Sequence, residues 1–224
     1  MNQPGRPALV LSAAALVGAC CSGAVRGGGP SQRRPVILIG MRGAGKTTLG
    51  KGAAQALGLE FEDLDETLEQ HVGMTCREFV AAHGWTAFRS KELEVLAASL
   101  APQSSAGCHN RMLACGGGVV ESAGAMALLR AWQGGTIVWI DRPIDAIIQA
   151  FGGDAGRPWG GLDEVKLREI FSRRKPLYEQ ACHHRFAVPA CCDVAEAIAE
   201  LSRWLRQPKD EGQRRAVWDF GAAT

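Results

Sequence analysis

The stretch GMRGAGKT, residues 40–47, lies between a short apolar run and a segment with helical periodicity. It matches the full P-loop pattern, in which glycines let backbone N–H groups converge on an anion at a helix N-terminus. The preceding run PVILIG is typical of a buried parallel strand, and Leu49, Ala53 and Leu57 recur every four residues in the segment that follows. The sequence therefore supplies strand, glycine loop and helix in the order that the motif requires.

The P-loop predicts a binding site for a purine nucleoside triphosphate with Mg²⁺. In such a site Lys46 pairs with the β- and γ-phosphates, and the Thr47 hydroxyl binds the metal. The chain has no NKxD motif, as a GTPase would have, and no apolar run ending in paired acids, as a motor or AAA-type ATPase would have. An ATP-dependent kinase is therefore favoured, and its predicted nucleotide-binding residues are Gly40, Arg42, Gly43, Ala44, Gly45, Lys46, Thr47 and Thr48.

Two carboxylates, Asp63 and Asp65, stand at the end of the predicted strand EFEDLD. Because alternate strand residues point to the same face, we expect both carboxylates to face the phosphate loop. One of them then supports Mg²⁺ through water, while the other accepts a proton from the hydroxyl of an acceptor molecule. Solvated acids in a turn are the alternative that this pattern leaves open.

The composition excludes several classes of partner and site. The 25 Lys and Arg against 23 Asp and Glu give a formal net charge of +2, which is too balanced for the basic stripe that duplex nucleic acid requires. We therefore expect no nucleic-acid partner. The eight cysteines include no CxxC pair, and Cys182, His183 and His184 are interpreted as a surface helix end rather than a metal site.

Strands and helices alternate along the rest of the chain. In the last predicted helix Asp193 is the N-cap, and Val194, Ile198, Leu201 and Leu205 share one apolar face. Alternation of this kind predicts an α/β fold with a central parallel sheet covered by helices on both sides. Besides the segments at 35–58, we expect strands within 60–65, 110–120 and 135–141, and helices at about 66–71, 76–82, 85–100, 143–151, 163–181 and 193–207.

Residues 1–34 form a predicted N-terminal extension. Its apolar segment ALVLSAAALVGACCSGAV is too short and too rich in Ala and Gly for a membrane span, so we expect no membrane partner. Three interpretations stay open: an organelle transit peptide, a disordered extension, or an incorrect start-codon assignment. A phosphate-binding motif argues against export and favours the cytoplasm, with a plastid or another organelle as the alternative. Residues 207–224 follow the last predicted helix as a C-terminal tail.

Six segments, taken in order, resemble the shikimate kinase family: GMRGAGKTT, DLDETLEQHVG, GWTAFRSKELEVL, CGGGVVE, GRPW and RRKPLYEQ. They look most like the shikimate-kinase domain of the fungal-type pentafunctional arom protein, or the related domain of the quinate-pathway repressor. The resemblance implies a P-loop domain over residues 35–206 with a three-layer fold like that of the nucleoside-monophosphate kinases.

The resemblance also implies an activity, the ATP-dependent phosphorylation of shikimate to shikimate 3-phosphate in chorismate biosynthesis. The partner would be this small-molecule substrate, and the domain would act as a monomer or as part of a larger fused polypeptide. Two alternatives stay open. One is a non-catalytic regulatory domain of the quinate-repressor type, and the other is another small-molecule kinase such as gluconate kinase.

Matching positions acquire roles through the same resemblance. Asp65 would activate the 3-hydroxyl of shikimate, Asp63 and Thr47 would hold Mg²⁺, and Arg157 would close with a lid on the transferred phosphate. The catalytic residues implied in this way are Lys46, Asp65 and Arg157. The implied substrate-binding residues are Asp65, Arg89, Gly116, Gly117, Gly118 and Arg174.

Arg89 and Arg174 would clamp the shikimate carboxylate, because the planar guanidinium fork meets both carboxylate oxygens. The sequence alone makes Arg173 an equally good candidate for the second position. The three glycines at 116–118 would let the backbone lie against the substrate ring, where a side chain would collide with it.

Overall fold

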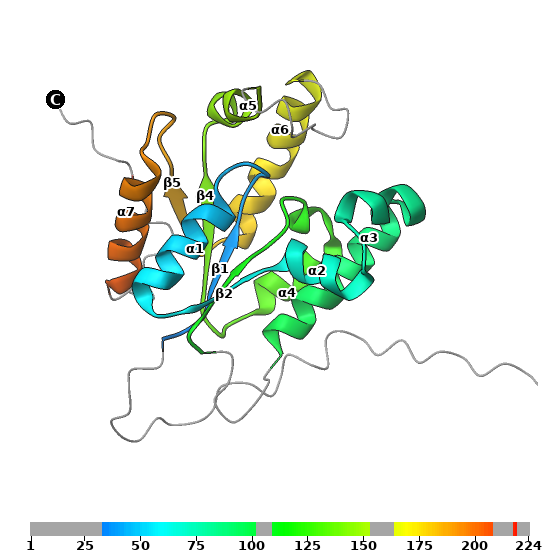
Figure 1. Cartoon of the computed structure of the whole chain (residues 1–224), viewed down its shortest axis with the longest axis horizontal. Coiled ribbons are helices and arrows are strands. Elements are labelled where there is room, and N and C mark those ends of the chain that lie inside the picture. The colour runs from blue at the N-terminus through cyan, green and yellow to red at the C-terminus, as the bar shows by residue number, and fades with distance from the viewer. Residues whose placement is uncertain (1–32, 102–108, 153–163, 208–216, 219–224) are drawn as a thin grey trace, which may run out of the picture.

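The structure is a computed structural model, and it describes residues 33–101, 109–152, 164–207 and 217–218 (Figure 1). The described strands form one sheet in the order β2-β3-β1-β4-β5-β6, and every neighbouring pair is parallel. These strands are β1 (Val36–Ile39), β2 (Glu60–Asp63), β3 (Arg111–Ala114), β4 (Thr136–Asp141), β5 (His184–Ala187) and β6 (Val217–Trp218).

Helices cover both faces of this sheet. Figure 1 shows α1 and α7 on one side, and α3 and α4 on the other. The helices are α1 (Lys46–Leu57), α2 (Leu64–Val72), α3 (Cys76–Leu100), α4 (Ala123–Ala131), α5 (Ile144–Gly152), α6 (Glu164–Ala181) and α7 (Val194–Arg206), with a short 3₁₀ turn, η2, at Val119–Glu121.

Strand β1 divides the core into two layers. Ile37 and Ile39 pack in a cluster with α3, α4 and the C-terminal part of α6, whereas Val36 and Leu38 pack in a cluster with α1 and α7. All four side chains are buried, as expected for a parallel strand whose two faces are both covered by helices. The predicted three-layer α/β fold with a central parallel sheet is therefore confirmed.

Local signals set the ends of the helices near the site. Thr75 caps α3 by accepting a hydrogen bond from the backbone N–H of Glu78, whose side chain accepts one from the Thr75 N–H in return. The two helices predicted at 76–82 and 85–100 are confirmed: α3 consists of two helical segments that meet at Gly84, whose φ of 81° is not helical. The predicted N-cap of α7 is confirmed, because Asp193 accepts from the N–H groups of residues 195 and 196.

Two predictions for the C-terminal third were wrong. His184 does not belong to a surface helix end: it is the buried first residue of β5, a strand that the sequence analysis missed. The apolar run of β5 is interrupted by Arg185, which is accommodated because its guanidinium pairs with Asp141 of β4. In α7, Val194 is exposed rather than part of the buried face, to which Trp204 contributes instead.

Several predictions concern the ends and gaps of the described chain. Val217 and Trp218, within the range assigned to the C-terminal tail, pair with β5 as the edge strand β6. Residues 1–32 of the predicted N-terminal extension, and Arg157 with its surrounding lid, lie outside the described residues. Among the residues that are described, no helix is both long enough and apolar enough to cross a membrane.

Candidate active site

The P-loop lies at the carboxyl end of β1 and runs directly into α1. Three of its glycines have positive φ angles, 146° at Gly40, 80° at Gly43 and 99° at Gly45. A Cβ atom at Gly40 would stand only 2.4 Å from the carbonyl oxygen of Ile140 in the neighbouring strand β4. Glycine is therefore required there both by the backbone conformation and by the close approach of β4.

Lys46, the first residue of α1, is buried beneath this loop. Its Nζ donates hydrogen bonds to the carbonyl oxygens of Gly40 and Met41, at 3.0 and 3.1 Å. Burial lowers the pKa of Lys46, while the nearby carboxylates of Asp65 and Asp63 oppose that shift. The ammonium group is thus poorly hydrated and held within the loop, where phosphate oxygens would be stronger acceptors than two neutral carbonyls.

Asp63 connects the P-loop to α2. Its Oδ2 accepts a hydrogen bond of 2.6 Å from the Thr47 hydroxyl, and its Oδ1 caps α2 by accepting one of 3.0 Å from the Asp65 N–H. The first of these contacts joins the two residues predicted to bind the metal, Thr47 and Asp63. Hydroxyl and carboxylate oxygens are ligands that Mg²⁺ prefers, so the residues present fit this ion.

The strand geometry predicted for the two carboxylates was wrong, because β2 ends at Asp63 and Asp65 lies in the first turn of α2. Asp65 nevertheless turns back toward the phosphate loop. Burial raises the pKa of Asp65, and the charge of Lys46 is the main opposing influence. The carboxyl group therefore sits in a poorly hydrated place beside the P-loop, which is a suitable environment for a general base.

The described residues contain no group of three or more His, Cys, Asp and Glu side chains that would hold a metal ion by themselves. A magnesium ion held by Thr47 and Asp63 would accordingly take its other ligands from phosphate oxygens and water, as is usual for Mg²⁺.

Two arginines from distant parts of the chain meet at one carboxylate. Arg89 of α3 donates from Nη2 to Oε2 of Glu121, at 3.2 Å, and Arg174 of α6 donates from Nη2 to the same oxygen, at 2.6 Å. Arg89 also donates from Nη1 to the buried Glu92, at 2.8 Å. The predicted clamp residues Arg89 and Arg174 are thus brought together at one carboxylate oxygen, next to Met41 of the P-loop segment, which Arg174 contacts through Nη1.

The structure also separates the two candidates for the second arginine of the clamp. The side chain of Arg174 is only 12% exposed and contacts Met41 of the P-loop segment through Nη1, whereas the side chain of Arg173 is 63% exposed. Arg173 also pairs with Glu121, but from the solvent side and through the other carboxylate oxygen, Oε1. Arg174 is therefore the arginine that faces the site.

The three successive glycines at 116–118 are explained by close contacts on three sides. A Cβ atom at Gly118 would stand 2.0 Å from Nη2 of Arg89, and one at Gly117 would stand 2.7 Å from the backbone nitrogen of Arg42. A Cβ atom at Gly116 would meet a carboxylate oxygen of Glu92 at 2.5 Å and one of Asp65 at 2.7 Å. The glycines therefore let α3, the P-loop and α2 converge on the loop after β3.

Three residues of this site were missed by sequence reasoning as functional residues. Glu92 and Glu121 hold the clamp arginines, and the Tyr178 hydroxyl donates to the carbonyl oxygen of Gly117. Glu121 follows the glycines in CGGGVVE, and Glu92 follows Arg89 by three residues on a helix, which is the spacing of a helical ion pair. These spacings were available signals, but the meeting of Glu121 with Arg174 depends on the fold.

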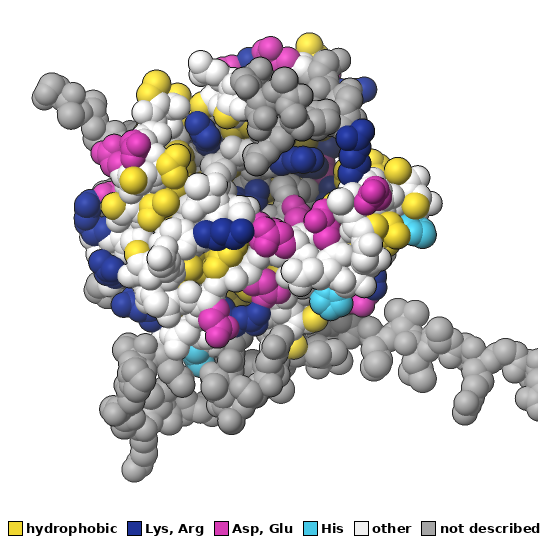
Figure 2. All heavy atoms as spheres, in the orientation of Figure 1, with side chains coloured by type: hydrophobic (Ala, Val, Ile, Leu, Met, Phe, Trp, Pro, Cys, Tyr) yellow, Lys and Arg dark blue, Asp and Glu magenta, His cyan; other side chains and the backbone are white. Residues whose placement is uncertain are grey.

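The surface agrees with this arrangement. In Figure 2, Lys and Arg side chains and Asp and Glu side chains gather around a hollow in the middle of the face shown.

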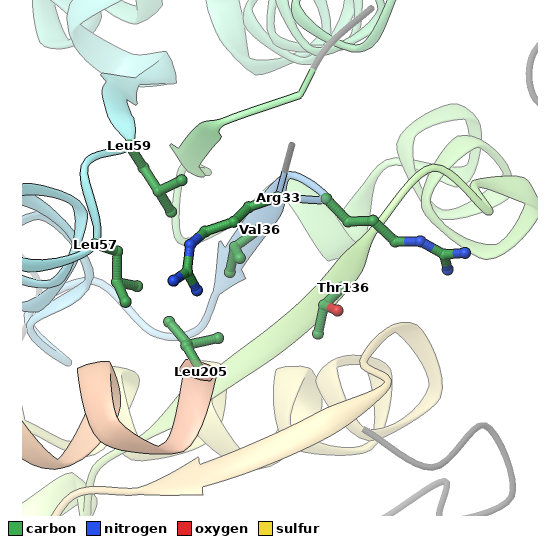
Figure 3. A pocket seen from close by; sticks show the side chains of 7 residues that line it. Arg33, Val36, Leu57, Leu59, Thr136 and Leu205 are labelled. Carbon is green, nitrogen blue, oxygen red and sulfur yellow. The ribbon is translucent and has the colours of Figure 1, made fainter. Parts of the chain in front are cut away.

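A separate pocket is shown in Figure 3. It is lined by Val36 and Thr136, the first residues of β1 and β4, together with Arg33, Leu57, Leu59 and Leu205. That pocket lies at the amino ends of the strands, opposite the P-loop, and is not the phosphate site.

The fold and the site together define a P-loop domain of the nucleoside-monophosphate-kinase-like class. Comparison with known families narrows this class. The family model of shikimate kinase matches residues 42–201, and the chain belongs to the shikimate kinase family.

Relatives in sequence are large fused proteins. The pentafunctional AROM polypeptide of Yarrowia lipolytica is 38% identical over 172 residues, which are 76% of this chain and 10% of that protein. That of Eremothecium gossypii is 39% identical over 167 residues, 73% of this chain and 10% of that protein. The chain thus spans about a tenth of the length of these curated relatives.

Solved structures of shikimate kinases match most of their own length. The shikimate kinase from Acinetobacter baumannii in complex with shikimate is 30% identical with a TM-score of 0.66, and the match covers 77% of this chain and 92% of that one. The shikimate kinase from Bacteroides thetaiotaomicron is 24% identical with a TM-score of 0.64, covering 78% and 99%, and supports the fold alone.

Proposed function

We propose that this domain transfers the γ-phosphoryl group of ATP to the 3-hydroxyl group of shikimate. The observation that carries the proposal is the convergence of Arg89 and Arg174 on one carboxylate oxygen, next to Met41 of the P-loop segment. Two guanidinium groups in that arrangement are suited to bind the carboxylate of a small substrate. The Acinetobacter baumannii relative, whose structure contains shikimate, supports this choice of substrate.

The P-loop residues would hold the nucleotide and orient the transferred phosphate. Backbone N–H groups of the glycine loop would face the phosphates, and Lys46 would exchange its two carbonyl acceptors for phosphate oxygens. Thr47 and Asp63 would hold Mg²⁺. When bound, the ion supplies positive charge that offsets the negative charge of the phosphates.

Asp65 would bind the ring hydroxyls of shikimate and accept the proton of the attacking hydroxyl. Its carboxyl group lies beside Gly116 and within the electrostatic reach of Lys46, so the acceptor and the phosphate would meet between Asp65 and Lys46. Transfer would be in line, with the protein contributing position and charge rather than a covalent intermediate. Arg157, outside the described residues, would complete the site by stabilising charge on the transferred phosphate.

Two rival functions make different predictions about the same residues. A regulatory domain of the quinate-repressor type would retain ligand binding without turnover, yet Lys46, Asp65 and both clamp arginines are all present here. Gluconate is also a carboxylated polyol, so a gluconate kinase would use a similar clamp with a linear acceptor. We favour shikimate, and we place the reaction in the cytoplasm, in a monomer or within a longer fused polypeptide like the relatives.

The test is ADP release by the purified chain with MgATP, measured with and without shikimate, and with gluconate and quinate as matched acceptors. Strong release that depends on shikimate is the expected result. ADP release with gluconate alone would identify the chain as a gluconate kinase instead. Shikimate or quinate binding by calorimetry without any turnover would instead support the regulatory function.

A further inference from the structure

The two oxygens of Glu121 have separate sets of partners. Oε2 accepts hydrogen bonds from Nη2 of Arg89 and Nη2 of Arg174, the two arginines that face the site. Oε1 accepts from Nε and Nη2 of Arg173, at 3.1 and 2.5 Å, on the solvent side. The contacts made by Oε2 are therefore the ones that the carboxylate of a substrate would need, and the contacts made by Oε1 are not.

Glu121 remains negatively charged in this environment. Partial burial on its own raises the pKa of Glu121, but the hydrogen bonds and charges of Arg174 and Arg173 lower it to about 2. The residue therefore does not give way to a substrate by taking up a proton. A second carboxylate can take the Nη2 donors of both arginines only if Oε2 gives up its hydrogen bonds to them, because two like charges in contact repel each other.

Arg174 has hydrogen-bonding capacity that Glu121 does not use. Its Nε is buried without a hydrogen-bond partner among the described residues, its Nη1 donates to the sulfur of Met41 at 3.8 Å, and its guanidinium also forms a hydrogen bond with the Tyr178 side chain. A thioether sulfur is a weak acceptor, and an unpaired buried donor costs free energy. A substrate carboxylate at this position would satisfy donors that the internal carboxylate leaves unsatisfied.

We propose that Glu121 is an internal carboxylate that occupies the arginine clamp when no substrate is bound, and that the substrate carboxylate displaces its Oε2 while Arg173 keeps Oε1 paired. This inference rests on the proposed function, and it makes Glu121 a specificity-determining residue for that function. A simple anion gains little by displacing Glu121, since it only replaces one anion with another. A substrate that also offers hydroxyl groups to Asp65 gains additional contacts, and these allow it to displace Glu121.

The test measures the dissociation constant of shikimate by calorimetry for the wild type, Glu121→Gln and the matched control Glu200→Gln. Glu200 pairs with Arg203 on α7, away from the clamp, so its variant makes the same chemical change without touching the site. We expect Glu121→Gln to bind shikimate about three- to tenfold more tightly, because the competing charge is gone, and Glu200→Gln to match the wild type. The uncharged methyl ester of shikimate is expected to bind Glu121→Gln no more tightly than the wild type.

Unchanged or weaker binding of shikimate by Glu121→Gln would overturn the proposal and make Glu121 a residue that merely holds the arginines in place. Thermal unfolding checks that each variant is folded, and Glu121→Ala repeats the test should the glutamine variant fail to fold. If the wild type does not bind shikimate at all, the proposed function fails, but the internal carboxylate is still tested by adding sulfate. Sulfate should then raise the unfolding temperature of Glu121→Gln more than that of the wild type, and equal shifts would overturn the proposal.

Discussion

Replacing Gly118 by Ala tests the placement of Arg89 directly. The added Cβ atom would stand 2.0 Å from Nη2 of Arg89. Non-bonded heavy atoms settle at roughly 3.5 Å, so the guanidinium group must move by about 1.5 Å. That movement breaks its hydrogen bonds to Glu92 and Glu121. Because displacement of about 1 Å in a positioning group lowers turnover by about 100-fold, we expect kcat/KM for shikimate to fall by about that factor.

Gly118→Ala should also destabilise the fold, because Glu92 is buried and loses its only described partner. The loss of a hydrogen bond to a charged group predicts a decrease of about 1.5–3 kcal/mol in the free energy of unfolding. Burial raises the pKa of Glu92 and the charge of Arg89 opposes it, so moving Arg89 raises that pKa further. Glu92 in the folded variant then binds a proton more tightly than it does in the unfolded chain. The loss in the free energy of unfolding relative to the wild type should therefore shrink as the pH falls toward 4.5, the ordinary pKa of glutamate.

The control is Gly58→Ala, at the C-terminal end of α1. Gly58 has a positive φ of 67°, and a Cβ atom there would have no neighbour within 4 Å. This variant should lose about 1 kcal/mol of stability from backbone strain, yet keep the wild-type kcat/KM for shikimate. Wild-type kcat/KM in Gly118→Ala, measured by coupled ADP release, would refute the placement of Arg89 in the substrate site.

Lys46→Ala is expected to abolish phosphoryl transfer by removing the charge at the β- and γ-phosphates, and wild-type ADP release in this variant would contradict the P-loop assignment. Asp65→Asn should bind ATP normally by calorimetry but lose transfer, whereas loss of ATP binding would mean that Asp65 serves the nucleotide. Because burial raises the pKa of Asp65, the wild-type kcat/KM should fall on the acid side through a pKa above the ordinary 3.8, and a lower value would exclude Asp65 as the base. Thr47→Val should raise the Mg²⁺ concentration needed for half-maximal activity by roughly tenfold, and an unchanged requirement would exclude Thr47 as a ligand.

The local parts of the site could be predicted because their geometry is encoded within a few consecutive residues. The P-loop needs only a strand, positive-φ glycines and a helix, all of which lie within residues 36–57. The family resemblance implied that Asp63 and Thr47 act together at the metal, and the structure brings these two side chains into contact. The position of Asp65 was predicted for the wrong reason, since a helix cap at Asp63 rather than strand alternation directs it to the loop.

The sequence by itself determined the phosphate loop, the parallel α/β architecture and the arginines suited to a carboxylate. Only the tertiary structure decided which arginine faces the site, since Arg173 and Arg174 are neighbours in sequence but differ in burial and in the atoms they contact. It also decided that Glu121 joins Arg89 to Arg174, because that contact requires η2, α3 and α6 to meet at one point. The physical reason is that backbone conformation follows from nearby residues, whereas the charge that a side chain meets depends on which distant elements pack against it.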